Sequence, residues 1–135
     1  MASIRKEIVI DASAECVWDA LRDWGGLHVR LVPGFATDAR LDGEDRIVTF
    51  ANGSVMRERL VDLDDDAHRL VWSIADPPYT HHNASAQVFA DGAARSRFVW
   101  IADLLPNELA GRTGPLMEQA LSVIKRTLEP ERPGR

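Results

Sequence analysis

The middle of the chain, residues 35–89, is a run of short alternating segments, and this pattern restricts the fold more than any other feature. Turn sequences separate the segments: Asp42-Gly43, Asn52-Gly53, Asp64-Asp65-Asp66 and Asp76-Pro77-Pro78. Apolar segments of this length, interrupted by such turns, are typical of antiparallel strands joined in a meander. The sequence therefore predicts a largely antiparallel sheet in the centre of the chain.

Two turns are specific enough to predict hairpins. Asn52-Gly53 lies between two apolar segments, and we expect a tight two-residue turn with positive φ at both central residues. Asp91-Gly92 would join a strand that ends near Ala90 to one that runs over residues 95–104. With the earlier segments, these hairpins give about six strands in succession.

Helical periodicity replaces the alternation at both ends of the chain. A short strand ending at Ile10 precedes Ser13, which can cap a helix, and a second short helical segment is expected over residues 27–32. Near the C-terminus, apolar residues recur at the spacing of one helical face. We expect the firm part of that helix to begin at residues 113–115 and to end at Glu129-Pro130. The apolar positions of this last helix are Met117, Ala120, Leu121, Ile124 and Leu128.

The order of elements predicts an α+β fold. One strand, two helical segments, about six antiparallel strands and one long helix give a curved sheet of about seven strands. The apolar stripe of the last helix needs a partner, and only a sheet face is large enough. The 135 residues suit a single domain, with residues 130–135 as a frayed tail. A curved sheet wrapped around one helix can leave a cavity between them.

Composition excludes several classes of function. A formal net charge of -5, with no basic patch, disfavours nucleic-acid binding. No apolar run approaches the roughly 20 residues needed to span a bilayer. The single cysteine, Cys16, rules out an intrachain disulfide, so we expect a cytoplasmic protein. We find no phosphate-binding glycine loop, dinucleotide fingerprint, nucleophile elbow or metal-ligand spacing, and expect neither a metal nor a cofactor.

Several segments together resemble a known family. They are residues 11–27, Val32-Pro33-Gly34, Arg57-Glu58-Arg59-Leu60, Asp64-Asp65-Asp66, Leu70 to Ile74, and Phe98-Val99-Trp100. In order and spacing they resemble the polyketide cyclase/dehydrase family of the START-like, helix-grip superfamily (SRPBCC). The resemblance covers nearly the whole chain. It implies a hydrophobic small molecule bound between the sheet and the C-terminal helix; some members are cyclases or aromatases.

A second resemblance, to the plant abscisic-acid receptors, implies individual positions. A glutamate and an aromatic residue that face the ligand in that branch fall at Glu58 and Trp72. A ligand-facing tyrosine falls at His82, which is a departure from the pattern. The basic residue that pairs with the hormone's carboxylate has no counterpart near residues 33–35, so an acidic, hormone-like ligand is not implied.

Strand alternation singles out Glu58 independently of any family. Met56, Glu58 and Leu60 share one face of their strand. A carboxylate on such an apolar face meets solvent at a cavity, pairs with a buried cation, or has a raised pKa because burial penalises its charge. The alternative is that the faces are assigned one residue out and that Glu58 is a solvated residue paired with an arginine.

His82 begins the next row, which otherwise consists of small side chains and should leave volume. Beside Glu58, its imidazole could transfer protons near neutral pH. The alternative is a structural histidine with a satisfied hydrogen bond. His81 and His82 cannot chelate one metal, because neighbouring strand residues point to opposite faces. Trp72 and Trp100 could belong either to the core or to a ligand-binding wall.

These observations lead to three functional hypotheses. The first is binding of a small, largely hydrophobic molecule; the protein itself would be a monomer or homodimer. The second is a polyketide cyclase or dehydratase with Glu58 and His82 as tentative catalytic groups, and the third is a non-catalytic protein-interaction or chaperone-like domain. The candidate ligand-binding residues are Met56, Glu58, Trp72, Ile74, His82, Ala84, Phe98, Trp100, Met117, Leu121 and Ile124.

Overall fold

The computed structural model describes residues 1–130 and contains one seven-stranded antiparallel sheet with two α-helices. The frayed tail expected at the C-terminus lies, from residue 131 onward, outside the described residues. The sheet order is β1-β7-β6-β5-β4-β3-β2, so the first strand closes one edge beside the last. In chain order the elements are β1 (Ala2–Ile10), α1 (Ala14–Arg22), the 3-10 turn η1 (Trp24–Gly26), the π-helical turn η2 (Leu27–Leu31), β2 (Ala36–Asp42), β3 (Asp45–Phe50), β4 (Val55–Asp64), β5 (Arg69–Ile74), β6 (His81–Ala90), β7 (Ser96–Leu105), the 3-10 turn η3 (Asn107–Leu109) and α2 (Ala110–Leu128).

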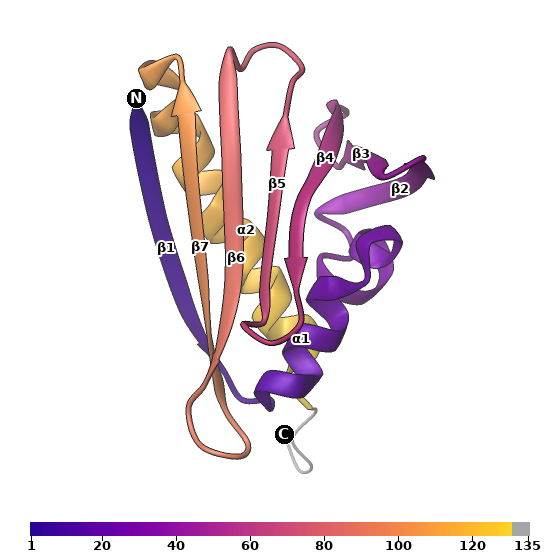
Figure 1. Cartoon of the computed structure of the whole chain (residues 1–135), viewed down its shortest axis with the longest axis vertical. Coiled ribbons are helices and arrows are strands. Elements are labelled where there is room, and N and C mark those ends of the chain that lie inside the picture. The colour runs from indigo at the N-terminus through magenta and orange to yellow at the C-terminus, as the bar shows by residue number, and fades with distance from the viewer. Residues whose placement is uncertain (131–135) are drawn as a thin grey trace.

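The sheet curves around α2, as Figure 1 shows. The helix runs behind β7, β6 and β5, while α1 lies at the lower right of the view, below β2 and β3. Lys6 of β1 pairs with Glu118 of α2 at 2.7 Å, which ties the helix to the closing strand. The predicted α+β helix-grip fold is confirmed, with seven strands where about seven were expected and the expected order of elements along the chain.

The first helix begins where the sequence predicts. Ser13 has extended backbone angles and its Oγ accepts a hydrogen bond from the Cys16 N–H at 3.1 Å, so it is the N-cap. Val17 and Leu21 are buried in the core, whereas Trp24 lies beyond the helix in η1. The indole Nε1 of Trp24 donates to the carbonyl of Glu44 at 3.0 Å, which attaches this connection to the β2–β3 hairpin.

The last helix begins earlier than expected. Residues 107–109 form a 3-10 turn that continues into α2 at Ala110, so Pro115 lies inside the helix and not in its first turn. The missing proline N–H removes one hydrogen bond near the N-terminal end, and the helix continues because packing of its buried face supports it. It ends at Leu128, with Glu129 as the C-cap, as predicted.

The β3–β4 turn differs from the predicted two-residue hairpin, and the difference sets the strand register. Gly53 alone has a positive φ there, and its N–H donates to the Phe50 carbonyl, so Ala51 and Asn52 are the central residues. A two-residue turn at Asn52-Gly53 would have placed Ile47 opposite Glu58. In the structure the residue opposite Glu58 is Arg46.

Candidate functional site

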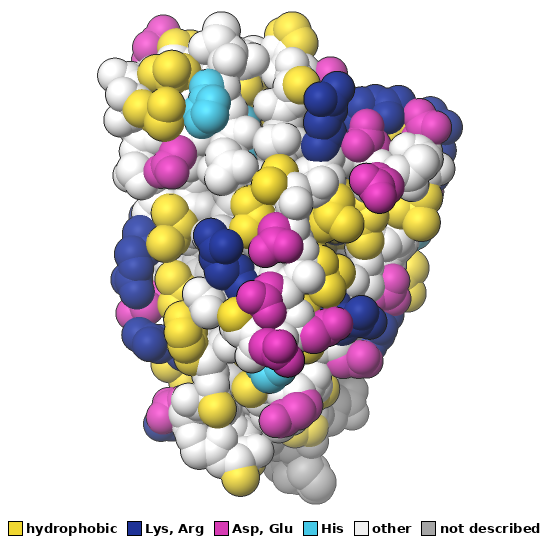
Figure 2. All heavy atoms as spheres, in the orientation of Figure 1, with side chains coloured by type: hydrophobic (Ala, Val, Ile, Leu, Met, Phe, Trp, Pro, Cys, Tyr) yellow, Lys and Arg dark blue, Asp and Glu magenta, His cyan; other side chains and the backbone are white. Residues whose placement is uncertain are grey.

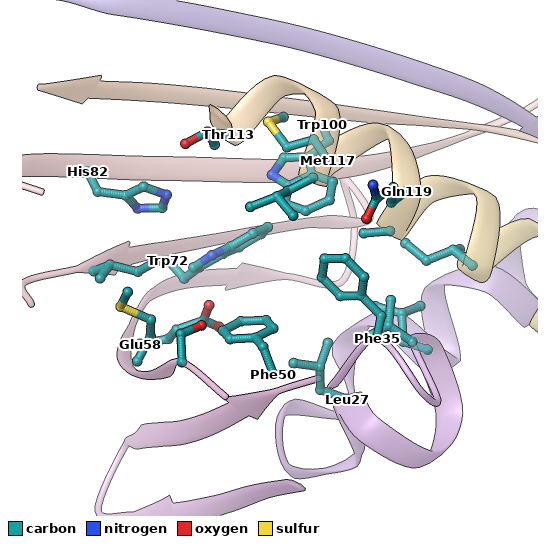
Figure 3. Close-up of a pocket in the computed structure, with 18 of the residues that line it drawn as sticks. Leu27, Phe35, Phe50, Glu58, Trp72, His82, Trp100, Thr113, Met117 and Gln119 are labelled. Atoms are coloured by element: carbon teal, nitrogen blue, oxygen red, sulfur yellow. The ribbon is translucent and has the colours of Figure 1, made fainter. Parts of the chain in front are cut away.

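A cavity of about 650 Å³ lies between the inner face of the sheet and α2. Figure 3 shows side chains from the sheet, from α2 and from the connection that contains Phe35 converging on it. The wall is mainly aliphatic and aromatic, with a few polar groups. Its lining residues are Leu21, Leu27, Leu31, Val32, Phe35, Arg46, Phe50, Ala51, Asn52, Ser54, Met56, Glu58, Leu70, Trp72, Ile74, Tyr79, His82, Phe98, Trp100, Arg112, Thr113, Leu116, Met117, Gln119, Ala120 and Ile124.

Nine of the eleven residues selected from the sequence line this cavity: Met56, Glu58, Trp72, Ile74, His82, Phe98, Trp100, Met117 and Ile124. The other two, Ala84 and Leu121, are buried but do not line it. The selected residues thus bring four strands, β4 to β7, to the cavity on one face of the sheet. One small residue and one helical residue of the selection lie outside its wall.

Ala84 is covered because two large neighbours occupy the space above it. Ala84 stands opposite Trp72 on β5, and Ala86 stands opposite Trp100 on β7. The two indole rings meet across β6 with their centroids 6.0 Å apart. The small residues of β6 were expected to leave an empty volume, but their size instead admits this pair of tryptophans.

Leu121 lies outside the cavity wall because the cavity faces only one side of the apolar stripe of α2. Arg112, Leu116 and Ala120 line the cavity at four-residue spacing. Leu121 follows Ala120 by one residue, about 100° around the helix axis, and belongs to the hydrophobic core. The apolar stripe of α2 is therefore wider than the part that faces the cavity.

Glu58 is buried and paired with a buried cation, which was one of the three states expected for it. The side chains of Arg46 and Glu58 are only 4% and 7% exposed. Nε and Nη2 of Arg46 lie 2.8 and 2.7 Å from Oε1 of Glu58. Burial lowers the pKa of Arg46, and the neighbouring carboxylate opposes that effect. An arginine nevertheless stays protonated at neutral pH, so the two groups form an ion pair.

Trp24 completes the surroundings of the guanidinium. Nη1 of Arg46 donates to the Trp24 carbonyl at 3.2 Å, and the guanidinium carbon lies 3.7 Å from the centroid of the Trp24 ring. A cation over an indole face is stabilised by the ring's negative potential. Arg46 is thus held on two sides before any ligand enters.

His82 is a neutral imidazole in a largely apolar setting. Burial, assisted by repulsion from His81, lowers the pKa of His82 to about 4. The ring lies against Tyr79, with centroids 5.0 Å apart, and its Nδ1 is buried without a hydrogen-bond partner among the described residues. Nδ1 of His82 therefore lacks the partner expected of a structural histidine, and a neutral imidazole has one donor and one acceptor nitrogen.

Glu58 and His82 belong to the same end of the cavity. Glu58 stands opposite Ile74 on β5, and continuing the β5–β6 register beyond Ser73 and Asn83 brings Ile74 opposite His82. The two polar side chains therefore lie on the inner face with only β5 between their strands. Figure 3 shows both pointing inward at this end, on either side of Trp72.

Tyr79 and Thr113 add a second polar contact that the sequence did not reveal. The Tyr79 hydroxyl and Thr113 Oγ1 are 2.9 Å apart, which joins the β5–β6 connection to α2. Tyr79 lies outside any strand, so alternation could not assign it a face.

Many of the lining residues missed from the sequence lie in connections or at the ends of strands. Phe35 and Phe50 pack edge to face with centroids 5.9 Å apart, and Ala51 N–H donates to the Phe35 carbonyl at 3.0 Å. Residues in turns carry no periodic signal, and contacts between two turns depend on the tertiary fold. Arg46 is different, because correct pairing of the β3–β4 hairpin would have identified it.

Neither a metal site nor a membrane span is found in the described part of the chain. No group of three or more histidine, cysteine or acidic side chains among residues 1–130 is arranged to hold a metal ion. No helix within the same residues is long and apolar enough to cross a bilayer.

Solved structures with this architecture support the class of protein. An uncharacterised protein from Bacillus thuringiensis superposes with a TM-score of 0.85 at 19% identity, covering 94% of this chain and 98% of its own. A START superfamily protein from Mycobacterium smegmatis gives 0.72 at 12% identity, over 92% and 97% of the two chains. The di-domain ARO/CYC BexL of the BE-7585A biosynthetic pathway gives 0.80 at 15% identity, over 94% of this chain and 46% of its own. No curated protein matches the chain in sequence.

The fold and its cavity define a START-like, helix-grip protein. Within that class, residues 1–129 match the family described as polyketide cyclase / dehydrase and lipid transport, and the chain belongs to this family.

Proposed function

We propose that the protein binds a small, largely hydrophobic molecule in the cavity between the sheet and α2. The observation that carries this proposal is an internal volume of about 650 Å³ behind a mainly apolar wall. Cavities of several hundred Å³ with few polar groups are typical of small-molecule sites. Membership of a family whose description includes lipid transport supports the same function.

In this proposal, the aromatic and aliphatic residues supply affinity and the polar residues orient the ligand. Trp72 and Trp100 form an aromatic wall, and Met117 and Ile124 cover it from α2. Apolar ligand surface that leaves water contributes about 25 cal/mol per Å². The end of the cavity near Glu58 and His82 would hold any polar group.

Binding can be tested with 1-methylpyrene, an apolar fluorophore that absorbs where tryptophan emits. Because Trp72 and Trp100 line the cavity, we expect saturable quenching of tryptophan emission by the wild-type protein. Ala120→Phe places a ring in the cavity and should weaken binding at least about tenfold. Ala90→Phe, on an exposed position of β6, is the matched control and should bind normally. Equal binding by both variants, or no saturable binding by the wild type, would contradict the proposal.

A cyclase or dehydratase acting on a polyketide-like carbonyl compound is the second candidate. The shared location of Glu58 and His82 at one end of the cavity favours it. Glu58 is held in the Arg46 ion pair, however, and the low pKa of His82 makes its imidazole a weak proton acceptor at neutral pH. This candidate would be supported if the wild-type protein cyclised a linear polyketone and if both Glu58→Gln and His82→Gln abolished that activity. Equal turnover by the variants would oppose it.

An interaction domain has less support. Figure 2 shows the outer face of the sheet, where apolar side chains are interspersed with charged groups of both signs. The chain also holds an internal cavity, whereas a docking domain needs a continuous exposed apolar patch.

A further inference from the structure

The cavity combines a buried ion pair with a carboxylate oxygen that no protein donor uses. The cavity-lining residues include three charged side chains: Arg46, Glu58 and Arg112. Arg46 and Glu58 neutralise each other inside the wall. Arg112 is exposed, so water screens its charge.

Among the described residues, an anionic group beside Glu58 would therefore find no buried free cation, because Arg112 is the remaining cation of the lining and is exposed. The two Arg46 nitrogens that approach the carboxylate, Nε and Nη2, both lie beside Oε1 of Glu58. Nη1 donates to the Trp24 carbonyl. His82 is uncharged at neutral pH and cannot compensate a negative group. Burying an uncompensated charge costs several kcal/mol, so both an anion and a cation would be disfavoured here.

Oε2 of Glu58 is an unused acceptor and, as part of a carboxylate, a stronger one than the neutral His82 ring, whose Nδ1 also lacks a partner. No hydrogen bond from the described residues reaches this oxygen. It is also not fully buried, so a ligand in the cavity can reach it. Figure 3 shows the Glu58 carboxylate pointing into the space between Phe50 and Trp72. A hydrogen bond to a carboxylate is stronger than one between neutral groups.

We infer that the ligand is an uncharged molecule with a hydroxyl group, and that this hydroxyl donates a hydrogen bond to Oε2 of Glu58. The inference rests on the proposed function and specifies its ligand. Arg46 then acts as the residue that sets specificity, because it holds the carboxylate in place and cancels its charge. Removing the negative charge of Glu58 should therefore change which ligand the protein prefers.

Three matched probes test this directly: 1-pyrenemethanol, 1-methylpyrene and pyrene-1-carboxylate. They share one ring system and differ in a hydroxyl, a methyl and an anionic group. We expect the alcohol to bind the wild-type protein about tenfold more tightly than the methyl compound, and the carboxylate to bind more weakly than either. Affinity is measured by quenching of tryptophan emission.

Glu58→Gln provides the decisive variant, because it leaves Arg46 as an uncompensated cation. The order should reverse, with the carboxylate bound more tightly than the alcohol. Glu44→Gln makes the same change in net charge at an exposed position outside the cavity and should keep the wild-type order. Wild-type protein that binds the carboxylate or the methyl compound at least as tightly as the alcohol would overturn the inference.

The outcomes separate the two proposals. Failure of all three probes to bind would contradict the proposed function itself. Binding of all three with equal affinity would leave hydrophobic binding intact and overturn only the assignment of a hydroxyl ligand. If Glu58→Gln does not fold, the order of the three probes on the wild-type protein still decides the inference.

Discussion

Arg46 and Glu58 stand directly opposite each other on β3 and β4, and their side chains form an ion pair inside the cavity wall. The pair explains how a carboxylate can occupy an apolar row without being a free acid or base. It also makes the cavity electrically neutral at its polar end, while Oε2 of Glu58 stays available. The stability of the fold and the chemistry of the site thus depend on the same contact.

Removing one partner of the pair should destabilise the folded protein more than replacing both partners by apolar residues. Arg46→Met leaves a buried carboxylate unpaired, which we expect to lower the free energy of unfolding by about 3–5 kcal/mol. The double variant Arg46→Met/Glu58→Leu should be more stable than Arg46→Met alone, because no unpaired charge remains. Urea denaturation at pH 7 measures both.

Arg30→Met is the control for the ion pair. Arg30 pairs with Asp19 and Asp23 on the surface, and exposed pairs contribute about 1 kcal/mol or less. A double variant less stable than Arg46→Met would show that the two buried groups do not depend on each other.

Stability should decrease below pH 6.5 because of His82. An unfolded histidine has a pKa near 6.5, whereas burial lowers the pKa of His82 to about 4 in the folded state. Between these values the unfolded state binds the extra proton, so stability is lost as the pH falls and no further loss arises from this group below about pH 4. The loss between pH 7 and pH 5 should be about 2 kcal/mol.

The contribution of His82 can be isolated by substitution. His82→Gln should remove the decrease in unfolding free energy, while His81→Gln, at an exposed position, should retain most of it. An NMR titration that finds His82 protonated at pH 6 would refute the prediction.

The Tyr79–Thr113 hydrogen bond should couple the β5–β6 connection to α2. Tyr79→Phe removes one hydroxyl and leaves the buried Thr113 without this partner, so we expect a loss of about 1 kcal/mol. A double-mutant cycle with Thr113→Val should give a coupling energy of about 1 kcal/mol. Strictly additive effects would mean that the contact contributes nothing to stability.

Two glycines should respond to alanine in opposite directions. Gly111 lies in α2 with open space around it, so Gly111→Ala should stabilise the protein by about 0.5–1 kcal/mol. Gly53 has φ +88°, which alanine adopts poorly, so Gly53→Ala should destabilise it by about 1 kcal/mol. Melting temperatures that shift in the same direction for both would contradict this explanation.

Much of the fold could be predicted because its signals are local. Alternation over residues 35–89 indicated antiparallel strands, Ser13 indicated the start of α1, and helical spacing indicated α2. Alternation also placed Glu58 and His82 on the inner face, because the period of a strand is two regardless of its neighbours. These features follow from backbone geometry and side-chain chemistry within a few residues.

The partner of Glu58 could not be predicted correctly, because it depends on the register. An error of one residue in the turn after β3 replaces Arg46 with Ile47 as the opposite residue. The cavity boundary depends on contacts between residues still farther apart in the sequence. The indoles of Trp72 on β5 and Trp100 on β7 meet over β6, and Tyr79 hydrogen-bonds to Thr113 of α2.

The sequence by itself determined the class of fold and the presence of a polar group on an apolar face, because both are set by local periodicity. Only the tertiary structure decided that Glu58 is compensated by Arg46, that His82 is neutral, and which side chains enclose the remaining volume. Those properties arise from burial and from pairing between distant segments, and neither is defined until the sheet has closed around α2.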